Sequence, residues 1–308
     1  MTRCMIVPAL LLSAVLGSAA DAAPVPIRKI LIIGIDGLRP DALSKADAPN
    51  MDTLIAEGTF APNTLTDVLA RSGPGWASVF TGVWNPIHGV RNNAFAGYRR
   101  AEYPTFFSRL KERRPGIKVG AVVNWSPIGT HLVGTDGFWM APGGDREVTS
   151  EASRVIRGGL SDVLFVHFDD VDHAGHRFGF SPHMPFYLWA VERVDRRVGE
   201  LRAAVREREA AGEEWLILST SDHGGSYRHH GENIPTHRRV FLLASGKDVP
   251  RAVEDGVRGV VDLAPTVFAW LGIPVPAAWG WEGRPLGIAP AAPAAEELAQ
   301  GKIERQQP

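Results

Sequence analysis

The chain of 308 residues has a single cysteine, Cys4, which lies ahead of an apolar run near the N-terminus. The rest of the chain therefore contains neither a disulfide nor a cysteine nucleophile. An excess of charge is also absent, since 33 basic and 34 acidic residues give a formal net charge of -1. A neutral chain has no overall field for a nucleic acid polymer or an anionic membrane surface, so an anionic substrate has to be captured locally.

Long apolar runs are absent except near the N-terminus. Arg3 precedes the apolar run Met5 to Leu16, and small residues follow up to an Ala-x-Ala sequence at Ala20 to Ala22. The run is too short for a stable membrane span, and the layout is typical of a secretory signal peptide, here residues 1–23. We expect a periplasmic or secreted protein without a membrane span after cleavage.

Five runs rich in β-branched residues are predicted strands: residues 29–36, 118–125, 162–170, 214–223 and 239–245. Their continuous hydrophobicity is typical of parallel strands covered on both faces. Helical patterns separate them, the clearest beginning at Ser181 and Pro182. The sequence predicts an α/β fold with a doubly wound, mostly parallel central sheet and helices on both faces, in which ligands bind beyond the carboxyl ends of the strands.

The length and composition fit one catalytic domain, which we assign to residues 24–288. The last segment, residues 289–308, is of low complexity and is predicted to be a tail. No internal repeat is present, and the sequence leaves the oligomeric state open.

Asp and His residues follow three of the predicted strands. Asp36 follows the first, the segment from Asp169 to His176 follows the third, and Asp222 and His223 follow the fourth. Because the carboxyl ends of parallel strands meet at one edge, these side chains are expected to converge. Asp and neutral His without thiolate favour Zn²⁺ in a hydrolytic site, with another divalent ion such as Mn²⁺ as a replacement.

Within these clusters, local geometry supports some residues more than others. Asp172 and His176 are four residues apart and point the same way on one helical turn. Asp222 and His223 are adjacent, so both can reach an ion only from a turn and not from a regular strand. Asp36 precedes a glycine, and on its own it fits a turn former as well as a ligand.

A serine lies in the stretch LARSGPGWASVFTG, residues 69–82. Gly73 and Gly75 allow close backbone approach, and a helix N-terminus following Ser72 would offer N–H groups to an anion. The residues alone fit a capped surface turn as well as a nucleophile.

Four blocks together resemble the type I phosphodiesterase/nucleotide pyrophosphatase branch of the alkaline phosphatase superfamily. They are ILIIGIDGLRPD, SGPGWASVFTGVWNPIHGVRNN, VDHAGHRFG and TSDHGG with HHG. The resemblance spans residues 28–288 and is weak at about 94–159, which it implies is a small variable region.

The resemblance implies an alkaline phosphatase-like fold and a site with two divalent metal ions, for which Zn²⁺ is favoured. The first ion would be held by Asp36, Ser72, Asp222 and His223. The second would be held by Asp172, His176 and His230. His229 and His237 stay open as alternatives to His230.

The resemblance also implies that Ser72 is the nucleophile and passes through a covalent phosphoserine, while Asn93 contacts a phosphate oxygen. The implied substrate is a small phosphate ester, with phosphodiester or pyrophosphate bonds favoured. Three alternatives stay open: a phosphomonoesterase, a sulfatase and an inactive binding protein. Trp76 stands where a sulfatase would have arginine, which disfavours that alternative.

Other polar and aromatic residues receive lesser roles. We expect His88 to hold the turn at Gly89, and one of Asp169 and Asp170 to orient His176 or cap the turn. Trp125 is a candidate for lining a leaving-group pocket. No role is assigned to His131, His167 or His183.

Overall fold

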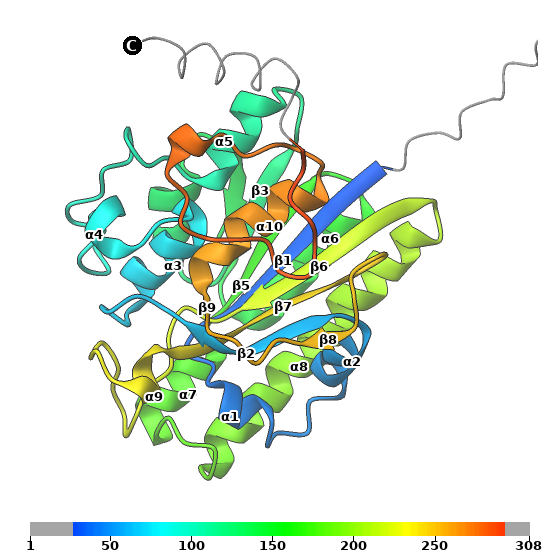
Figure 1. Cartoon of the computed structure of the whole chain (residues 1–308). Coiled ribbons are helices and arrows are strands. Elements are labelled where there is room, and N and C mark those ends of the chain that lie inside the picture. Colours follow the sequence, from blue (N-terminus) through cyan, green and yellow to red (C-terminus); the bar gives the residue numbers. More distant parts are fainter. Residues whose placement is uncertain (1–26, 293–308) are drawn as a thin grey trace, which may run out of the picture.

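The computed structural model describes residues 27–292, so the predicted signal peptide and the tail from residue 293 lie outside the described residues. A nine-stranded sheet crosses the molecule in the order β4-β3-β5-β1-β6-β7-β2-β8, with β9 beside β2 (Figure 1). The strands are β1 (Ile27–Ile35), β2 (Thr59–Leu65), β3 (Val119–Val123), β4 (Phe138–Met140), β5 (Val163–Phe168), β6 (Glu213–Thr220), β7 (Arg239–Gly246), β8 (Ala252–Val253) and β9 (Arg258–Gly259).

The strands from β4 to β6 run parallel, and β7 runs antiparallel to both β6 and β2. The predicted doubly wound, mostly parallel sheet is therefore confirmed, and so are the five predicted strands. Strands β2 and β4 were not among the predicted strands. Strand β2 contains Pro62 and alternates between buried and half-buried residues, and β4 has only three residues.

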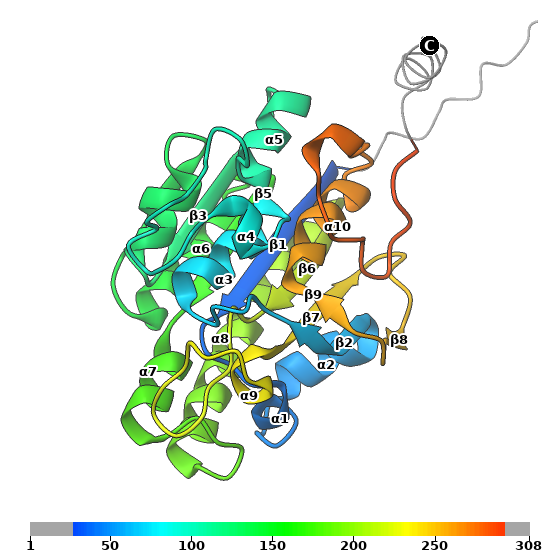
Figure 2. The ribbon, with the colours of Figure 1, turned by 60° about the vertical axis from the view of Figure 1, so that its left-hand side comes forward.

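Helices cover both faces of the sheet (Figures 1 and 2). The α-helices are α1 (Pro40–Leu43), α2 (Pro49–Glu57), α3 (Ser72–Thr81), α4 (Asn85–His88), α5 (Phe106–Arg113), α6 (Asp145–Arg157), α7 (Asp170–Phe178), α8 (Pro185–Glu209), α9 (Pro235–Arg238) and α10 (Leu263–Trp270). Helices α3, α5 and α10 pack on one face, and α2, α6 and α8 pack on the other. None of the helices within residues 27–292 is both long enough and apolar enough to cross a bilayer.

The long helix α8 begins later than predicted. The start at Ser181 and Pro182 is wrong, because the helix begins at Pro185 after Met184, which is extended with φ −90° and ψ 109°. A residue before proline avoids the α conformation, so Pro185 prevents a helix that starts at Pro182 from continuing through Met184. Pro185 instead takes the first helical position, where its missing N–H costs nothing.

Strand β1 shows why the apolar runs are continuous. Ile30 and Ile32 face the core beneath α3, α5 and α10, while Leu31 and Ile33 face the core beneath α2, α6 and α8. All four side chains are fully buried. Both faces of the central strands are covered, which is the arrangement that parallel sheets require.

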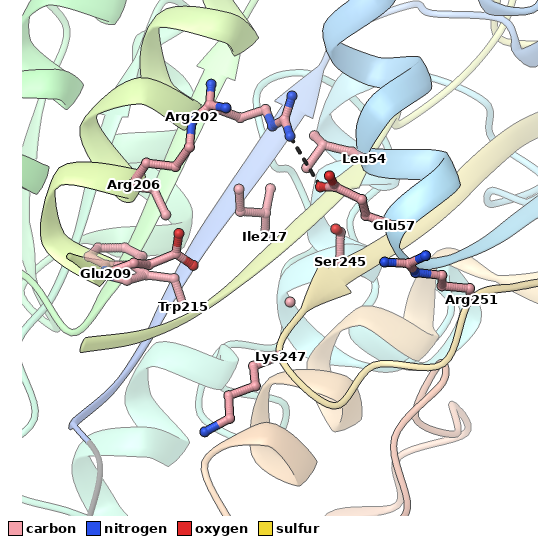
Figure 3. Close-up of a pocket in the computed structure, with 12 residues that line it drawn as sticks. Leu54, Glu57, Arg202, Arg206, Glu209, Trp215, Ile217, Ser245, Lys247 and Arg251 are labelled. Carbon is pink, nitrogen blue, oxygen red and sulfur yellow. Dashed lines mark hydrogen bonds and ion pairs between the residues drawn. The ribbon is translucent and has the colours of Figure 1, made fainter. Parts of the chain in front are cut away.

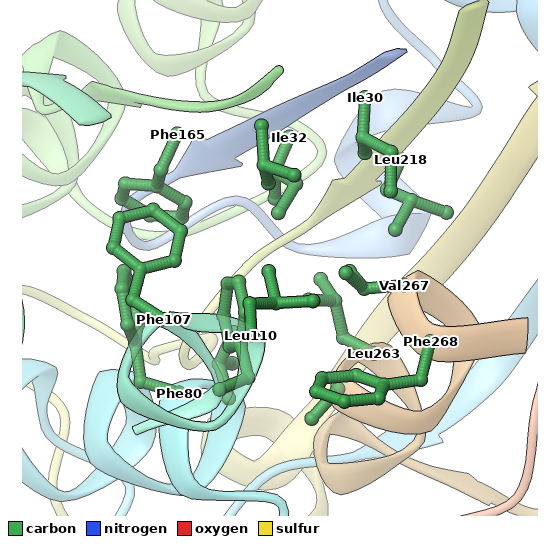
Figure 4. Packing of buried hydrophobic residues seen from close by; sticks show 14 of the residues in the cluster. Ile30, Ile32, Phe80, Phe107, Leu110, Phe165, Leu218, Leu263, Val267 and Phe268 are labelled. Carbon is green, nitrogen blue, oxygen red and sulfur yellow. The ribbon is translucent and has the colours of Figure 1, made fainter. Parts of the chain in front are cut away.

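Helix α3 is held on the sheet by aromatic packing (Figure 4). Phe80 lies edge-on to Phe165 of β5, with ring centroids 4.8 Å apart, and stacks with Phe106 of α5 at 5.1 Å. Phe107 meets Phe80 edge-on at 5.6 Å. Because α3 begins at Ser72, this packing also fixes the position of the serine.

Replacing Phe80 with alanine removes the centre of this aromatic cluster. We expect Phe80→Ala to lower the free energy of unfolding by about 3–5 kcal/mol, because the buried cavity is only partly refilled. Urea unfolding followed by circular dichroism measures the change. The control is Phe186→Ala on α8, whose side chain is mostly exposed and whose loss should cost about 1 kcal/mol or less. Equal losses in the two variants would contradict this account of α3.

Candidate active site

The predicted strand ends meet at one edge of the sheet. Strands β5, β1 and β6 are neighbours and run parallel, so their carboxyl ends lie side by side. Asp36 directly follows β1, helix α7 follows β5, and Asp222 and His223 lie in the turn after β6. The structure thus brings together side chains from segments nearly 190 residues apart.

The first cluster consists of Asp36, Asp222 and His223, all fully or almost fully buried. The His223 Nε2 atom lies 3.3 Å from Asp36 Oδ1 and 3.4 Å from Asp222 Oδ2. The peptide N–H of Gly37 donates to Asp222 Oδ1 at 3.3 Å. The other carboxylate oxygen of Asp222 is left facing Asp36 and His223.

The second cluster consists of Asp172, His176 and His230. One turn of α7 places His176 Nε2 3.4 Å from Asp172 Oδ2, as the spacing predicted. His230 Nε2 lies 3.1 Å from His176 Nε2 and 3.9 Å from Asp172 Oδ1. The His223 and His230 rings stack 3.7 Å apart, and Asp172 Oδ1 lies 4.0 Å from His223 Nε2, so the two clusters are contiguous.

Four buried atoms of these clusters have no hydrogen-bond partner among the described residues. They are Asp36 Oδ1, Asp172 Oδ1, Asp222 Oδ2 and His223 Nε2. Buried polar atoms are almost always satisfied, so bare carboxylate oxygens and an imidazole nitrogen pointing at one another need a further partner. Oxygen and imidazole nitrogen donors without thiolate are a suitable set for divalent metal ions, and the residues present fit such ions.

The electrostatics of the clusters also favour a cation. Burial, and then the charge of Asp36, raise the pKa of both Asp172 and Asp222 well above the usual range. Burial alone would lower the pKa of His223, but the carboxylates of Asp222 and Asp36 raise it to about 10. A proton therefore binds tightly where the carboxylates converge, and positive charge of any kind is stabilised there.

The structure separates the three candidate histidines of the HHGENIPTH segment. His230 reaches the second cluster, and its Nδ1 is held by the carbonyl of Ala70 at 3.0 Å. His229 instead lies 3.4 Å from Glu232. Both ring nitrogens of His237 are occupied, by the Ser226 hydroxyl at 2.8 Å and the Glu232 N–H at 3.1 Å. The geometry favours His230 over the other two as a ligand.

Ser72 is the first residue of α3, the helix whose Gly75 and Trp76 contact Asp222 and Asp36 of the first cluster. Its side chain is almost buried, and its hydroxyl forms no hydrogen bond with any described residue. The next residues of the helix touch the cluster, since a Cβ on Gly75 would lie 2.5 Å from the carbonyl oxygen of Asp222. Only glycine permits this approach, which explains the glycine one turn after the serine.

Asn93 lies at the same helix N-terminus. The N–H of Gly73 donates to Asn93 Oδ1 at 3.0 Å, and a Cβ on Gly73 would lie 2.4 Å from the carbonyl of Asn92. The loop that carries Asn93 is thus pressed against the first turn of α3. Asn93 therefore contacts the residue that follows Ser72; the catalytic roles of Ser72 and Asn93 stay predictions.

Two residues that the sequence left without a role position Asp36. Trp76 Nε1 donates to Asp36 Oδ2 at 3.0 Å, and His167 Nε2 lies 3.0 Å from the same oxygen. Burial would raise the pKa of Asp36, but the His167 hydrogen bond and the facing His223 ring hold it well below the usual range. These two contacts turn Oδ1 toward the clusters. The only signal in the sequence is a histidine inside an otherwise apolar strand.

The expectation that Asp169 or Asp170 orients His176 is wrong. His176 Nδ1 faces the carbonyl of Arg228 at 2.9 Å. Asp169 lies 3.4 Å from His173, and Asp170 lies 3.4 Å from Arg193. Asp169 thus faces His173 one turn along α7, and Asp170 faces Arg193 of α8.

The N-terminus of α7 is capped by a residue that sequence reasoning missed. Asp145, the first residue of α6, accepts hydrogen bonds from the N–H groups of Asp169 at 2.9 Å and Asp170 at 3.1 Å. It also accepts from Asn124 Nδ2 at 2.7 Å. In the sequence Asp145 is indistinguishable from an ordinary acidic residue in a first helical turn.

Two contacts complete the surroundings. The Tyr187 hydroxyl of α8 donates to the carbonyl of Gly37 at 2.6 Å, next to Asp36. Trp125 is half-buried after β3, and its ring stacks on Phe95 at 6.0 Å, which in turn stacks on His131 at 4.6 Å. A leaving-group pocket at Trp125 stays a prediction.

His88 holds the loop that leads to Asn93, as expected. Its Nδ1 accepts from the N–H of Val90 at 3.1 Å, and its Nε2 lies 3.0 Å from the Ser78 hydroxyl of α3. The ring is fully buried, and burial, followed by the charge of Arg99, lowers its pKa to about 3. His88 is therefore neutral in the folded protein at neutral pH.

A model of the type I phosphodiesterase/nucleotide pyrophosphatase family matches residues 30–149 and 147–236. Among curated proteins, ectonucleotide pyrophosphatase/phosphodiesterase family member 7 of Mus musculus is 25% identical over 238 residues, 68% of this chain and 53% of that protein. The 2,3-bisphosphoglycerate-independent phosphoglycerate mutase 2 of Methanosarcina acetivorans is 35% identical over 136 residues, 42% of this chain and 24% of that protein. The chain thus spans about half of the former relative and a quarter of the latter.

Two solved structures show the same fold. Murine ectonucleotide pyrophosphatase/phosphodiesterase 5 superposes with a TM-score of 0.65 at 15% identity, covering 81% of this chain and 96% of that one. A sulfatase-like protein from Bacteroides thetaiotaomicron, titled a putative sulfatase, superposes with a TM-score of 0.70 at 14% identity, covering 85% and 74%. The alkaline phosphatase-like α/β fold is therefore confirmed.

Replacing His167 removes one of the two contacts that orient the Asp36 carboxylate. We expect His167→Phe to weaken the binding of added Zn²⁺ by about 10–100-fold, because outer hydrogen bonds orient a ligand and raise its basicity. Isothermal titration of chelator-treated protein with Zn²⁺ measures the affinity. His183→Phe is the control, because the His183 side chain is exposed and forms no hydrogen bond or ion pair with Asp36. Unchanged affinity in folded His167→Phe would refute the positioning role.

The neutral state of His88 predicts a pH dependence of stability. Its folded pKa of about 3 lies below the ordinary 6.5, so the unfolded chain binds the extra proton as the pH falls below 6.5. The advantage of wild type over His88→Gln should shrink by about 1.4 kcal/mol per pH unit between pH 6 and pH 4. Urea unfolding at several pH values measures it. A constant difference across this window would mean that His88 is protonated in the fold.

Proposed function

The chain belongs to the type I phosphodiesterase/nucleotide pyrophosphatase family, and from that premise we propose that it hydrolyses small phosphate esters, with phosphodiester or pyrophosphate bonds favoured. The observation that carries the proposal is the set of four bare, buried ligand atoms at the sheet edge, against which the first turns of the serine-bearing helix α3 pack through Gly75 and Trp76. The family is one of phosphoric ester hydrolases by its name, and the proposal extends that chemistry to this chain.

We propose that two divalent metal ions, with Zn²⁺ favoured, bind at the two clusters. The residues that would hold the first are Asp36, Ser72, Asp222 and His223, and those that would hold the second are Asp172, His176 and His230. The grouping of Asp172, His176 and His230 within ligand distance of one another supports the second set, and the bare atoms of Asp36, Asp222 and His223 support the first. When bound, such ions supply positive charge to the phosphoryl oxygens and acidify oxygen nucleophiles.

The chain's own residues suit an in-line displacement. The Ser72 oxygen forms a bond to phosphorus while the bond from phosphorus to the leaving oxygen breaks; the serine loses its proton and the leaving oxygen gains one. Water then attacks the phosphoserine and restores the free hydroxyl. Of the first turn of α3, only the N–H of Ser72 has no partner among the described residues and can face the anion, because Gly73 donates to Asn93, Gly75 donates to Arg71 and Pro74 has no N–H. Asn93 positions that turn and contacts a phosphate oxygen.

The alternatives fit the structure less well. A sulfatase would need arginine at position 76, where Trp76 is fully buried and already engaged with Asp36. An inactive binding protein would have no need for an unpartnered serine beside the clusters. A phosphomonoesterase shares the whole site and is the remaining alternative within phosphate chemistry.

The substrate we propose is a small molecule and not a nucleic acid polymer. A solved structure of murine ectonucleotide pyrophosphatase/phosphodiesterase 5, in an inactive form, is a complex with AMP, which suggests nucleotides as the first compounds to assay. The signal-like N-terminus suggests that the enzyme acts in the periplasm or outside the cell, where Zn²⁺ can be acquired.

Substrate choice and nucleophile can be tested in one series. We expect zinc-loaded protein to hydrolyse bis-p-nitrophenyl phosphate faster than p-nitrophenyl phosphate, and to leave p-nitrophenyl sulfate intact. Ser72→Ala should lose at least about 10³-fold in kcat, because the covalent step is removed. Release of p-nitrophenol at 405 nm gives the rates. The matched control is Ser108→Ala, a serine of α5 outside the clusters.

Metal removal and mass spectrometry complete the test. Chelation by EDTA should abolish turnover, and added Zn²⁺ should restore it. Rapid acid quenching should trap a phosphate on the peptide that contains Ser72. Full activity of Ser72→Ala, or faster hydrolysis of the sulfate ester, would overturn the proposed function.

A further inference from the structure

A second cavity lies at the opposite edge of the sheet from the two clusters. It has a volume of about 370 Å³ and is walled by α8, α2 and the end of β7 (Figure 3). Its floor includes Trp215 and Ile217 from the first half of β6, whereas Asp222 and His223 follow the other end of that strand. The cavity is therefore separate from the candidate active site, and its volume suits a small molecule.

Three arginines, Arg202, Arg206 and Arg251, line this cavity. Arg202 of α8 is buried. One of its guanidinium N–H groups donates a hydrogen bond to the Glu57 carboxylate of α2 at 3.2 Å. The remaining N–H groups of Arg202 form no hydrogen bond with any described residue. Arg206, one turn further along α8, and Arg251, across the cavity, form no ion pair in the described part of the chain. Guanidinium groups with unused donors bind carboxylate or phosphate oxygens in pairs.

The other residues that line the cavity provide a hydroxyl group, an apolar surface and two carboxylates. The Ser245 hydroxyl lies among these residues (Figure 3), is 5% exposed and has no hydrogen-bond partner among the described residues. Trp215, Ile217 and Leu54 provide an apolar surface beside it. Glu57 and Glu209 also line the cavity, and their charge disfavours a ligand with several anionic groups.

We propose that this cavity binds a small organic anion with a single phosphate or carboxylate head. The head is bound by the three arginines and the Ser245 hydroxyl, and an aryl or alkyl body lies on Trp215 and Ile217. Burial, only partly offset by Glu57, lowers the pKa of Arg202, so an anionic head also relieves a desolvated cation.

The test counts binding sites on the metal-loaded protein. The probes are 4-fluorophenylphosphonate, 4-fluorobenzoate and inorganic phosphate, and equilibrium dialysis gives the number bound per chain. The variant is Arg206→Ala with Arg251→Ala, because both side chains are exposed and their loss leaves the core intact. The matched control is Arg196→Ala, an exposed arginine of α8 that does not line the cavity.

We expect the double variant to bind one fewer molecule of each organic anion, or to weaken that site by about tenfold or more, while Arg196→Ala binds as wild type does. Hydrolysis rates should be the same in all three proteins. Binding of the organic anions that is equal in wild type and double variant would overturn the proposal. So would inorganic phosphate binding as tightly as the organic anions. Failure of the proposed hydrolysis would change the total number of sites but not this difference.

Discussion

Mutual repulsion among three buried carboxylates is the constraint on which the site depends. Asp36, Asp172 and Asp222 come from three different segments, yet all face His223 within 4.0 Å. Such an arrangement opposes folding unless a cation is present or protons are taken up. The parallel strands β5, β1 and β6, covered on both faces, provide the rigidity that holds these groups together. The same repulsion favours a positive charge at this edge of the sheet.

Hydrogen bonds from neighbouring residues orient the carboxylates of Asp36 and Asp222. Trp76 and His167 bind one oxygen of Asp36, and Gly37 binds one oxygen of Asp222. In each case the second oxygen is left for the cluster. Helix α3 contributes twice, because Ser72 begins it and Trp76 lies one turn later on it. A single packed helix therefore sets both the position of the hydroxyl and the orientation of the carboxylate beside it.

The central strands and the residues at their ends could be predicted because they depend on local patterns. Continuous apolar runs mark β1, β5 and β6, and an Asp lies within two residues of the end of each. His167 could not be predicted, because its contact with Asp36 depends on register: it lies opposite Gly34 in the β1–β5 pair, and no local pattern encodes that alignment. Strand β2 was missed because its residues are mixed in polarity and include a proline. The separation of His230 from His229 and His237 depends on the three-dimensional course of their loop, which no local pattern encodes.

Helix α8 contacts both the carboxylate cluster region and the second cavity. At its start, the Tyr187 hydroxyl holds the carbonyl of Gly37 beside the carboxylate cluster, and near its end Arg202 and Arg206 line the second cavity. Its 25 residues span about 37 Å. The length of this one helix therefore sets the spacing between the backbone that follows β1 and the arginines of the second cavity.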